Sequence, residues 1–516
     1  MSTVAPGPPE ENGAVLNRPL LAALSAAKLV LHLALAGRYG YFRDELYFLD
    51  CGRHLAFGYV DHAPLIALIS RAALALGGSL YALRVFPALA GATLVALAIL
   101  IAWRLGGGAF AQAVAGVSIL AAPVYQAVHG ILSMNAFEPV FWMGAIYVLI
   151  RILQTGDGRR WIVLGLLLGV GLENKHSTAF LGIALAVALV LSPERRALRT
   201  RWPWIAAALA LAIFLPNLLW QVQHGFPTLE GLANVRRSGK NVVPGPIAFV
   251  GQQVLMLHPV LLPVWLAGLA WLFAGARGRY RVLGWTFVAF FALLFALRGK
   301  NYYLAPIYPM LLAAGGVALE RGLRRAGDRR WPKAAILAVI AVASAITAPM
   351  ALPILPPARY VAYEQAIGFA PPKTEVGHRG PLPQHFGDRF GWPELVAEVA
   401  RVYNALPPED RARAAVFANN YGEAGAVNLF GPQYGLPPAI CPHQNHFLWG
   451  PRGNTGAVLI VLQDDRETLD RVCASVEEAG VHFHPWGMAE ENSPIYVCRG
   501  LHPPLPEMWP RLKKWN

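Results

Sequence analysis

Long apolar stretches dominate the first two thirds of the chain. A helix that crosses a bilayer needs about 20 mostly apolar residues. Eleven stretches approach this pattern and predict transmembrane helices: Pro19–Ala36, Leu80–Trp103, Ala109–Val128, Ala136–Leu153, Trp161–Leu172, Ser177–Leu191, Trp202–Val222, Phe249–Phe273, Val282–Leu297, Tyr303–Leu319 and Trp331–Pro349. The fifth and sixth are short, and only the polar run Glu173–His176 separates them. They could therefore form one broken span instead.

The connections between these stretches alternate in charge. Every second connection is short and rich in Arg and Lys, from Arg104 to the run Arg321–Lys333. Short basic connections stay on the cytoplasmic side of a membrane. The pattern predicts a multi-pass protein of the cell inner (plasma) membrane, with a cytoplasmic N-terminus and an extracytoplasmic C-terminus.

Composition agrees with a membrane protein. The 516 residues are 55% hydrophobic and only 14% charged, whereas soluble domains carry about 25% charged residues. This shortage excludes one large soluble enzyme and a disordered chain. The net charge of +14 could indicate a nucleic-acid partner, but the positions of the basic residues explain it by topology. We therefore expect membrane lipid and no nucleic acid among the partners.

The chain divides into a membrane part and a tail. We predict a disordered cytoplasmic segment over 1–18, a transmembrane domain over 19–351 with an amphipathic first outer loop at 38–79, and a small extracytoplasmic α/β domain over 352–516. In the tail, strands are expected at Ala414–Ala418, Ala457–Leu462, His482–His484 and Ile495–Cys498, and a helix at Glu467–Ala479. These follow from short apolar runs and from helical spacing.

Three of the four cysteines lie in the tail, on the side where disulfides are permitted. Cys473 and Cys498 could pair, although the sequence does not fix the connectivity. No CxxC spacing occurs, so a zinc site is not expected.

Polar side chains gather at the predicted outer ends of the spans. The first outer loop contains two segments with helical spacing, Asp44–Leu55 and Leu65–Leu76. Asp44 and Glu45 stand together at the start of the first segment, where acids favour a helix N-terminus. They could serve as a cap, as a general base at the membrane surface, or as both.

A resemblance to a known class follows from several segments in order. The first outer loop has an acidic pair followed by D-H-x-P-L, and further on come SMNAFEPVFWMGAIYVLIR (133–151), LPNLLWQVQHGFPTL (215–229) and RGKNYYLAPIYPMLLAAGG (298–316). This order resembles the GT-C class of membrane glycosyltransferases, and within it the protein mannosyltransferase family (glycosyltransferase family 39) and the bacterial aminoarabinose transferases of lipid A. No single motif is highly specific, and the order of the motifs carries the likeness. The implied fold is a GT-C-like polytopic α-helical membrane protein of about 11 helices, with the small C-terminal α/β domain on the outer face.

The resemblance implies transfer of a sugar, with inversion, from a polyprenyl-phosphate donor to a hydroxyl of a glycan, protein or lipid. By carry-over Asp44 is the general base and Glu45 the adjacent candidate. The phosphate leaving group needs positive charge and hydrogen-bond donors; the candidates are Lys300, Arg298, Lys175, His176, His224, Tyr302 and Tyr303, with Arg236 and Arg237 as further cations. Glu138 corresponds to a second acid that orients the acceptor or binds a metal. Asn135 lies where some family members carry an acid, and Asp61 and His62 are further candidates for this role.

Several alternatives stay open. A divalent cation, Mg²⁺ or Mn²⁺, could be held by Asp44, Glu45 or Glu138, and no organic cofactor is expected. His443, Asn445 and His446 of the tail could reach over the active site or have a structural role in their loop. A membrane transporter or lipid flippase is the alternative function. Its hallmarks are internal repeats and ionisable groups near the midplane, whereas here no repeat is evident and the charges lie near helix ends.

Overall fold

The structure is a computed structural model that describes residues 14–275, 278–371, 375–376 and 380–516. The predicted disordered segment 1–18 therefore lies mostly outside the described residues. The chain forms two compact units. The first comprises Met1–Ala36, Arg84–Asn217 and Val243–Ile354, and the second comprises Gly37–Leu83, Leu218–Val242 and Leu355–Asn516.

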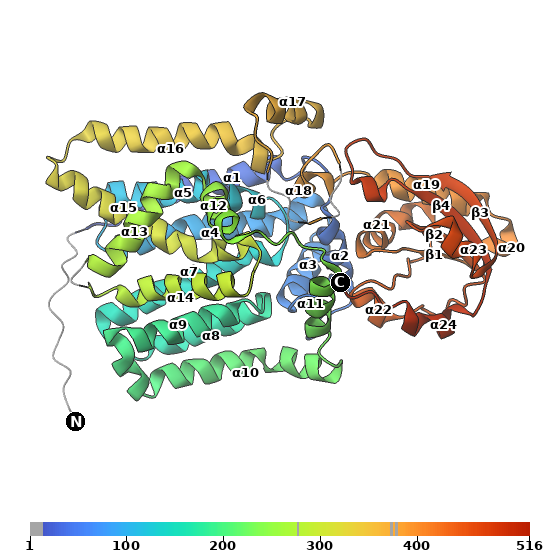
Figure 1. Ribbon diagram of the computed structural model, residues 1–516, viewed down its shortest axis with the longest axis horizontal. Coiled ribbons are helices and arrows are strands. Elements are labelled where there is room, and N and C mark those ends of the chain that lie inside the picture. Colours follow the sequence, from blue (N-terminus) through green and yellow to red (C-terminus); the bar gives the residue numbers. More distant parts are fainter. Residues whose placement is uncertain (1–13, 276–277, 372–374, 377–379) are drawn as a thin grey trace. The chain divides into compact units, whose positions relative to one another are not determined.

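The apolar stretches predicted from the sequence are all helical. Their helices are α1 (Arg18–Leu35), α4 (Leu80–Arg104), α5 (Ala109–Ala121), α6 (Pro123–Val128), α7 (Met134–Thr155), α8 (Arg160–Asn174), α9 (Thr178–Leu191), α10 (Trp202–Gln223), α12 (Pro246–Leu257), α13 (Leu262–Ala274), α14 (Arg281–Ala296), α15 (Tyr308–Arg325) and α16 (Arg330–Ala351). A break predicted at the polar run Glu173–His176 is present, although α8 extends to Asn174 and the residues between α8 and α9 are 175–177. The long helices of the first unit lie side by side (Figure 1).

The length and apolar character of a helix decide whether it can span a membrane. Among the described residues, six helices are long and apolar enough to cross a membrane, and two bent pairs raise this to eight. One pair is Thr178–Leu191 with Pro193–Arg199, bent by 110°, and the other is Pro246–Leu257 with Pro259–Ala274, bent by 93°. The chain is thus a multi-pass membrane protein, while the count of eleven spans stays a prediction.

The second unit combines two segments of the membrane part of the sequence with the tail. The predicted first outer loop, 38–79, contributes α2 (Arg43–Arg53) and α3 (Leu65–Ala75), close to the two helical segments predicted there. Residues 218–242 contribute the end of α10 and α11 (Pro227–Ser238). The tail adds α17 (Pro357–Ile367), α18 (Gln384–Gly387), α19 (Trp392–Ala405), α20 (Pro408–Arg411), α21 (Tyr421–Phe430), α22 (Asn445–Trp449), α23 (Arg466–Asp470) and α24 (Leu505–Met508).

A four-stranded mixed sheet forms the core of the tail. Its strands β1 (Ala414–Phe417), β2 (Val458–Leu462), β3 (Cys473–Val481) and β4 (Pro494–Leu501) are arranged in the order β1-β2-β4-β3. β1 pairs parallel with β2, and β4 pairs antiparallel with both β2 and β3. The strands predicted at Ala414–Ala418, Ala457–Leu462 and Ile495–Cys498 are confirmed. The tail therefore contains both helices and a sheet, while its being a separate small domain on the outer face stays a prediction.

The prediction of a helix over Glu467–Ala479 is wrong. Only Arg466–Asp470 is helical, and the chain then enters β3, which lies at the edge of the sheet. Pairing with β4 and a disulfide between Cys473 and Cys498 hold this segment extended, because tertiary contacts override a weak local preference. The predicted strand His482–His484 is also wrong, since β3 ends at Val481. The suggested pairing of Cys473 with Cys498 is confirmed.

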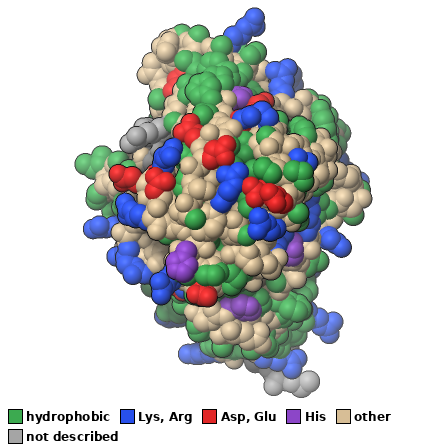
Figure 2. All heavy atoms as spheres, turned by 90° about the vertical axis from the view of Figure 1, so that its right-hand side faces the viewer, with side chains coloured by type: hydrophobic (Ala, Val, Ile, Leu, Met, Phe, Trp, Pro, Cys, Tyr) green, Lys and Arg blue, Asp and Glu red, His purple; other side chains and the backbone are tan. Residues whose placement is uncertain are grey.

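Both faces of the sheet are covered. Ile460 and Val497 pack on one face with α19 and α21, and Leu459 and Tyr496 pack on the other with the segments around α23 and α24. Leu46 of α2 belongs to the first of these clusters. The predicted first outer loop therefore packs into the hydrophobic core of the tail. Figure 2 shows one side of the molecular surface, where acidic and basic side chains are interspersed with hydrophobic ones.

Candidate functional site

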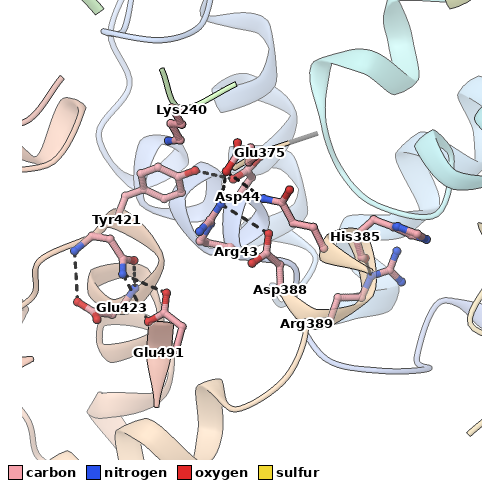
Figure 3. Close-up of polar contacts among 12 residues, drawn as sticks. Arg43, Asp44, Lys240, Glu375, His385, Asp388, Arg389, Tyr421, Glu423 and Glu491 are labelled. Carbon is pink, nitrogen blue, oxygen red and sulfur yellow. Dashed lines mark hydrogen bonds and ion pairs between the residues drawn. The ribbon is translucent and has the colours of Figure 1, made fainter. Parts of the chain in front are cut away.

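Asp44 and Glu45 take different roles at the start of α2. The Glu45 carboxylate is buried, and its Oε2 accepts the backbone N–H of Phe42 at 2.9 Å, which satisfies one of the free donors of the first helical turn. Asp44 is half-buried, and its Oδ1 accepts a hydrogen bond from the Tyr421 hydroxyl at 2.9 Å. Figure 3 shows the Tyr421 ring reaching toward Asp44. Glu45 thus caps the helix, and the carboxylate of Asp44 points to Tyr421.

The position of Tyr421 follows from how α21 begins. Asn420 caps this helix, because its Oδ1 accepts a hydrogen bond from the backbone N–H of Glu423 at 3.0 Å. In turn, Glu423 Oε2 accepts a hydrogen bond from the backbone N–H of Asn420 at 3.2 Å. This reciprocal pattern is a capping box. Tyr421 is the next residue after the cap, so its backbone is held by the first turn of the helix.

Two glycines let α21 approach α2 closely. A Cβ on Gly425 would lie 2.7 Å from the carbonyl carbon of Leu46, and one on Gly422 would clash with the side chain of Arg43. Positions 422 and 425 lie on one face of a helix because they are three residues apart. The two helices are bonded at both ends, by Tyr421 to Asp44 and by Asn428 to Asp50 at 2.7 Å. They therefore run side by side in the same direction.

Arg43 stands among the acids. Its Nη2 lies 3.6 Å from Asp388 Oδ2 and 4.0 Å from Glu375 Oε2, and its guanidinium lies 5.8 Å from the centre of the Tyr421 ring (Figure 3). Asp388 is almost completely buried. Burial raises the pKa of Asp388 to about 7 against the opposing effect of Arg43. The guanidinium of Arg43 is thus close enough to pair with the carboxyl groups of both Asp388 and Glu375.

The surroundings of the Asp44 carboxyl group raise the pKa of this residue. Burial raises it, and the negative charges of Asp61 and Glu375 add to the effect, while Arg43 and the hydrogen bond from Tyr421 lower it. The outcome is a pKa above the ordinary value for aspartate. A carboxylate with a raised pKa is a stronger base than a free one, which suits removal of a proton from a hydroxyl.

Asp61 and His62 differ in their exposure to solvent. Both were expected from the sequence to belong to the site. Asp61 is exposed, and its Oδ1 accepts a hydrogen bond from Tyr47 at 2.8 Å. His62 is buried among aromatic rings, stacked at 4.4 Å on Tyr59, and its Nδ1 lies 2.9 Å from its neighbour's carbonyl at Ala63. Burial lowers the pKa of His62. Asp61 and Asp44 are thus linked by two tyrosines: Tyr47 bonds to Asp61 and Tyr421 bonds to Asp44. The rings of these tyrosines lie 4.9 Å apart.

The tail loop that holds His443, Asn445 and His446 contacts the same region. Asn445 Oδ1 accepts the N–H of Val60 at 3.3 Å, and the N–H of Asn445 bonds to the Tyr47 hydroxyl at 3.3 Å. His443 packs on the Tyr421 ring at 4.8 Å, and burial lowers its pKa. The loop thus supports Tyr47, which bonds to Asp61, and Tyr421, which bonds to Asp44.

A pair of buried glutamates lies beside the cap of α21. Asn420 Nδ2 donates to Glu491 Oε1 at 3.2 Å, and Glu423 and Glu491 also interact with each other. Burial raises the pKa of Glu423 to about 7. Burial also raises the pKa of Glu491 well above its ordinary value, and the charge of Glu423 adds to this second shift. The pair therefore retains a proton at a pH where free glutamates are ionised.

A second polar cluster lies in the first unit, between the start of α7 and the turn from α8 to α9. Lys175 Nζ donates to Glu138 Oε2 at 2.9 Å and to Asn135 Oδ1 at 2.8 Å, and it lies 4.4 Å from the centre of the Tyr303 ring. Ser177 donates to the other oxygen of Glu138. Four residues expected from sequence to lie in the site are thus in contact here, namely Asn135, Glu138, Lys175 and Tyr303.

The remaining expected residues are spread over several elements. In the first unit, His176 Nε2 lies 3.1 Å from Asn217 Oδ1, and Tyr302 packs edge-on against Tyr303 at 4.9 Å. Lys300 precedes the short helix Asn301–Ile307, and Arg298 is exposed with a positive φ of 52°. In the second unit, the exposed His224 stacks on Trp220 at 4.1 Å, with Arg236 and Arg237 exposed further along α11.

Metal ligands were also expected among these acids. Within the residues that the structure describes, no group of three or more His, Cys, Asp or Glu side chains is arranged to hold a metal ion. Glu45 is bonded to its own helix start and Glu138 to Lys175 and Ser177. These residues do not form a ready cation site.

Sequence reasoning missed Tyr421, Glu375 and Asp388. They lie hundreds of positions from Asp44 in the chain, so no local spacing joins them. The segment Asn420–Gly425 does carry a readable signal, because Asn420 and Glu423 form the pattern of a capping box and two glycines follow at a three-residue interval. The signal predicts a closely packed helix start, but it does not name the partner.

Comparison with known proteins adds independent evidence. Residues 61–220 match the family described as dolichyl-phosphate-mannose-protein mannosyltransferase. The chain is also 26% identical over 226 residues to lipid A galacturonosyltransferase RgtD of Rhizobium johnstonii. That alignment covers 43% of this chain and 47% of the relative. The matched part of this chain therefore spans about half of the relative's length.

Solved structures show the same fold over nearly the whole chain. ArnT from Cupriavidus metallidurans bound to undecaprenyl phosphate matches with a TM-score of 0.61 and 16% identity, over 93% of this chain and 97% of that one. The apo state of ArnT matches with a TM-score of 0.60 and 15% identity, with the same coverage. Together these matches support a glycosyltransferase fold of the GT-C class.

Proposed function

We propose that this membrane protein, whose fold is of the GT-C glycosyltransferase class, transfers a sugar from a polyprenyl-phosphate donor to an acceptor hydroxyl with Asp44 as the general base. The observation that carries the proposal is the carboxylate of Asp44, half-buried in the first outer loop, held by Tyr421 and raised in pKa. Support for the class comes from the fold shared with ArnT and from the family match over residues 61–220.

In the proposed reaction, Asp44 takes the proton of the acceptor hydroxyl as its oxygen attacks the anomeric carbon. The carbon–oxygen bond to the donor phosphate breaks on the opposite face, so the configuration inverts. The acceptor oxygen is a poor nucleophile until its proton moves, which is why a base is required. Arg43 and Tyr421 favour the ionised form of Asp44, the form that can accept this proton.

The leaving group is a polyprenyl phosphate. It departs as a stable anion and needs positive charge rather than a proton. Lys175, Lys300 and Arg298 are the cations proposed to meet it, with His176, His224, Tyr302 and Tyr303 as further donors. Lys175 already pairs with Glu138, so Glu138 is proposed to hold the lysine in position as well as to orient the acceptor.

We further propose that the reaction takes place on the outer side of the inner membrane. The basic connections that predict the orientation are the support for this placement. The acceptor is a glycan, protein or lipid, and the relative named for lipid A makes a glycolipid the first choice. A requirement for Mg²⁺ or Mn²⁺ stays a prediction, tested by transfer with EDTA and with each ion restored.

The experiment that tests the class is incubation of the purified full chain, in detergent or vesicles, with radiolabelled polyprenyl-phosphate sugars. We expect release of the polyprenyl phosphate and movement of label to an acceptor for at least one sugar. No consumption of any donor, together with movement of labelled lipid across vesicles, would contradict the proposal in favour of a flippase.

A further inference from the structure

A pocket of about 370 Å³ opens at the end of α2 that is remote from Asp44. Asp50, Arg53 and His54 line it from the end of α2, and Asn428 lines it from the end of α21. Arg53 is nine residues after Asp44, which is about 13 Å along a helix. The pocket is therefore a separate site from the acids around Asp44.

Positive charge predominates in its wall. Arg452 is exposed and lines the pocket, and within the described part of the chain it has no hydrogen bond or ion pair with an acid. Arg53 Nη1 bonds to Asp50 Oδ1 at 2.7 Å, which leaves its other nitrogens available. An arginine without an acidic partner in a hollow surface is suited to an anion that presents two oxygens side by side, such as a phosphate or a carboxylate.

The polar groups are held in fixed positions. Asp50 is buried, and besides Arg53 it accepts a hydrogen bond from Asn428 Nδ2 at 2.7 Å. Asn428 is fixed in turn, because its Oδ1 accepts the N–H of Ala439 at 2.9 Å. The His54 ring stacks on Trp449 at 4.3 Å. Arg53 is thus oriented by a buried acid, as in a site formed before its ligand binds.

The rest of the wall is apolar. Pro432, Leu436, Pro437 and Pro438 line one side. A bare inorganic anion would leave this side uncovered, whereas a sugar ring presents carbon–hydrogen faces along with hydroxyl groups. The volume is near the small end of the range for ligand pockets, about 300–1,000 Å³, which suits a single sugar unit.

We propose that this pocket binds a monosaccharide unit that carries a phosphate or carboxylate group, with Arg53 and Arg452 on the anion and the proline side against the ring. The proposal goes beyond sugar transfer at Asp44. It assigns a second carbohydrate site to the unit that contains the tail.

The test is isothermal titration calorimetry on the purified full chain in detergent. The probes are glucose 1-phosphate, glucuronate, uncharged glucose and inorganic phosphate. We expect glucose 1-phosphate, glucuronate or both to bind, and the two arms decide which anion the site prefers. Equal binding of glucose would overturn the role of the charge, and equal binding of inorganic phosphate would overturn the role of the sugar ring. Absence of binding for both anionic sugars would overturn the site.

The variants locate the binding. Arg452→Gln should weaken the anionic sugar at least about tenfold, the equivalent of about 1.4 kcal/mol. Arg471→Gln, an exposed arginine on the same unit, removes the same charge and should leave the affinity unchanged. Unchanged affinity in Arg452→Gln would contradict the assignment. Asp44→Asn should bind normally, so a failure of this pocket and a failure of the transferase proposal are distinguishable.

Discussion

The Tyr421 hydroxyl donates a hydrogen bond to the Asp44 carboxylate at 2.9 Å, although the two residues are 377 positions apart. The contact joins the predicted first outer loop to the tail within one compact unit. It places a tail residue on the proposed base. The tail therefore contributes to the environment that sets the basicity of Asp44.

Tyr421→Phe should change the pH dependence of sugar transfer. The hydrogen bond from Tyr421 lowers the pKa of Asp44, so its loss raises that pKa and moves the acidic limb of the rate profile to higher pH. At acidic pH we expect a loss of up to about tenfold, as for one hydrogen bond to a charged group. The exposed Tyr434→Phe is the matched control. An acidic limb at the wild-type position would show that Tyr421 does not tune the base.

Glu491→Gln should stabilise the protein at alkaline pH. The folded pKa values of Glu423 and Glu491 are raised above the unfolded value of about 4.3. The folded state then binds more protons than the unfolded state, so stability is lost as the pH rises from about 4 through 7. We expect the thermal midpoint of the variant to be about 2–4 °C higher at pH 8 and unchanged at pH 4. The exposed Glu467→Gln should show neither effect, and a midpoint at pH 8 equal to that of the wild type would contradict the shared proton.

The Glu138–Lys175 pair lends itself to a double-mutant cycle. Glu138 is buried and Lys175 is mostly buried, so Glu138→Gln or Lys175→Gln alone leaves an uncompensated charge and should cost about 3–5 kcal/mol. The double variant should recover much of this loss in thermal unfolding. Additive losses would show that the pair is not coupled. If Lys175 also meets the donor phosphate, the double variant regains stability but not transfer.

The disulfide between Cys473 and Cys498 ties the edge strand β3 to β4. The replacement of both cysteines by serine should lower the stability of the tail by about 2–5 kcal/mol, since the cross-link restricts the unfolded chain. Thermal unfolding with and without a reductant checks this. The reductant should shift the wild type and leave the double variant unchanged, and an insensitive wild type would mean that the bond does not form.

The membrane helices could be read from the sequence because apolar stretches are a strong signal, and each predicted stretch is helical. The polar residues at their ends were also found, and Lys175, Glu138, Asn135 and Tyr303 do meet. The tail was less predictable. The segment after Glu467 became a strand because of its partner β4 and a disulfide, neither of which is visible locally.

The contacts around Asp44 show the same limit. Glu45 could be a cap or a base from the sequence, and only the bond to the Phe42 N–H identifies the cap. Tyr421 and Asp388 reach Arg43 and Asp44 through the packing of α2 on the tail, made possible by Gly422 and Gly425. Such long-range contacts leave no periodic trace in one sequence.

The most direct test of the account is the rate at which Asp44→Asn transfers sugar from a polyprenyl-phosphate donor, measured beside the wild type and the exposed Asp470→Asn. The amide retains a partner for Tyr421 but cannot take a proton. We predict a loss of about a hundredfold or more with an unchanged thermal midpoint, and normal transfer by Asp470→Asn. Transfer by Asp44→Asn at the wild-type rate would contradict the central claim.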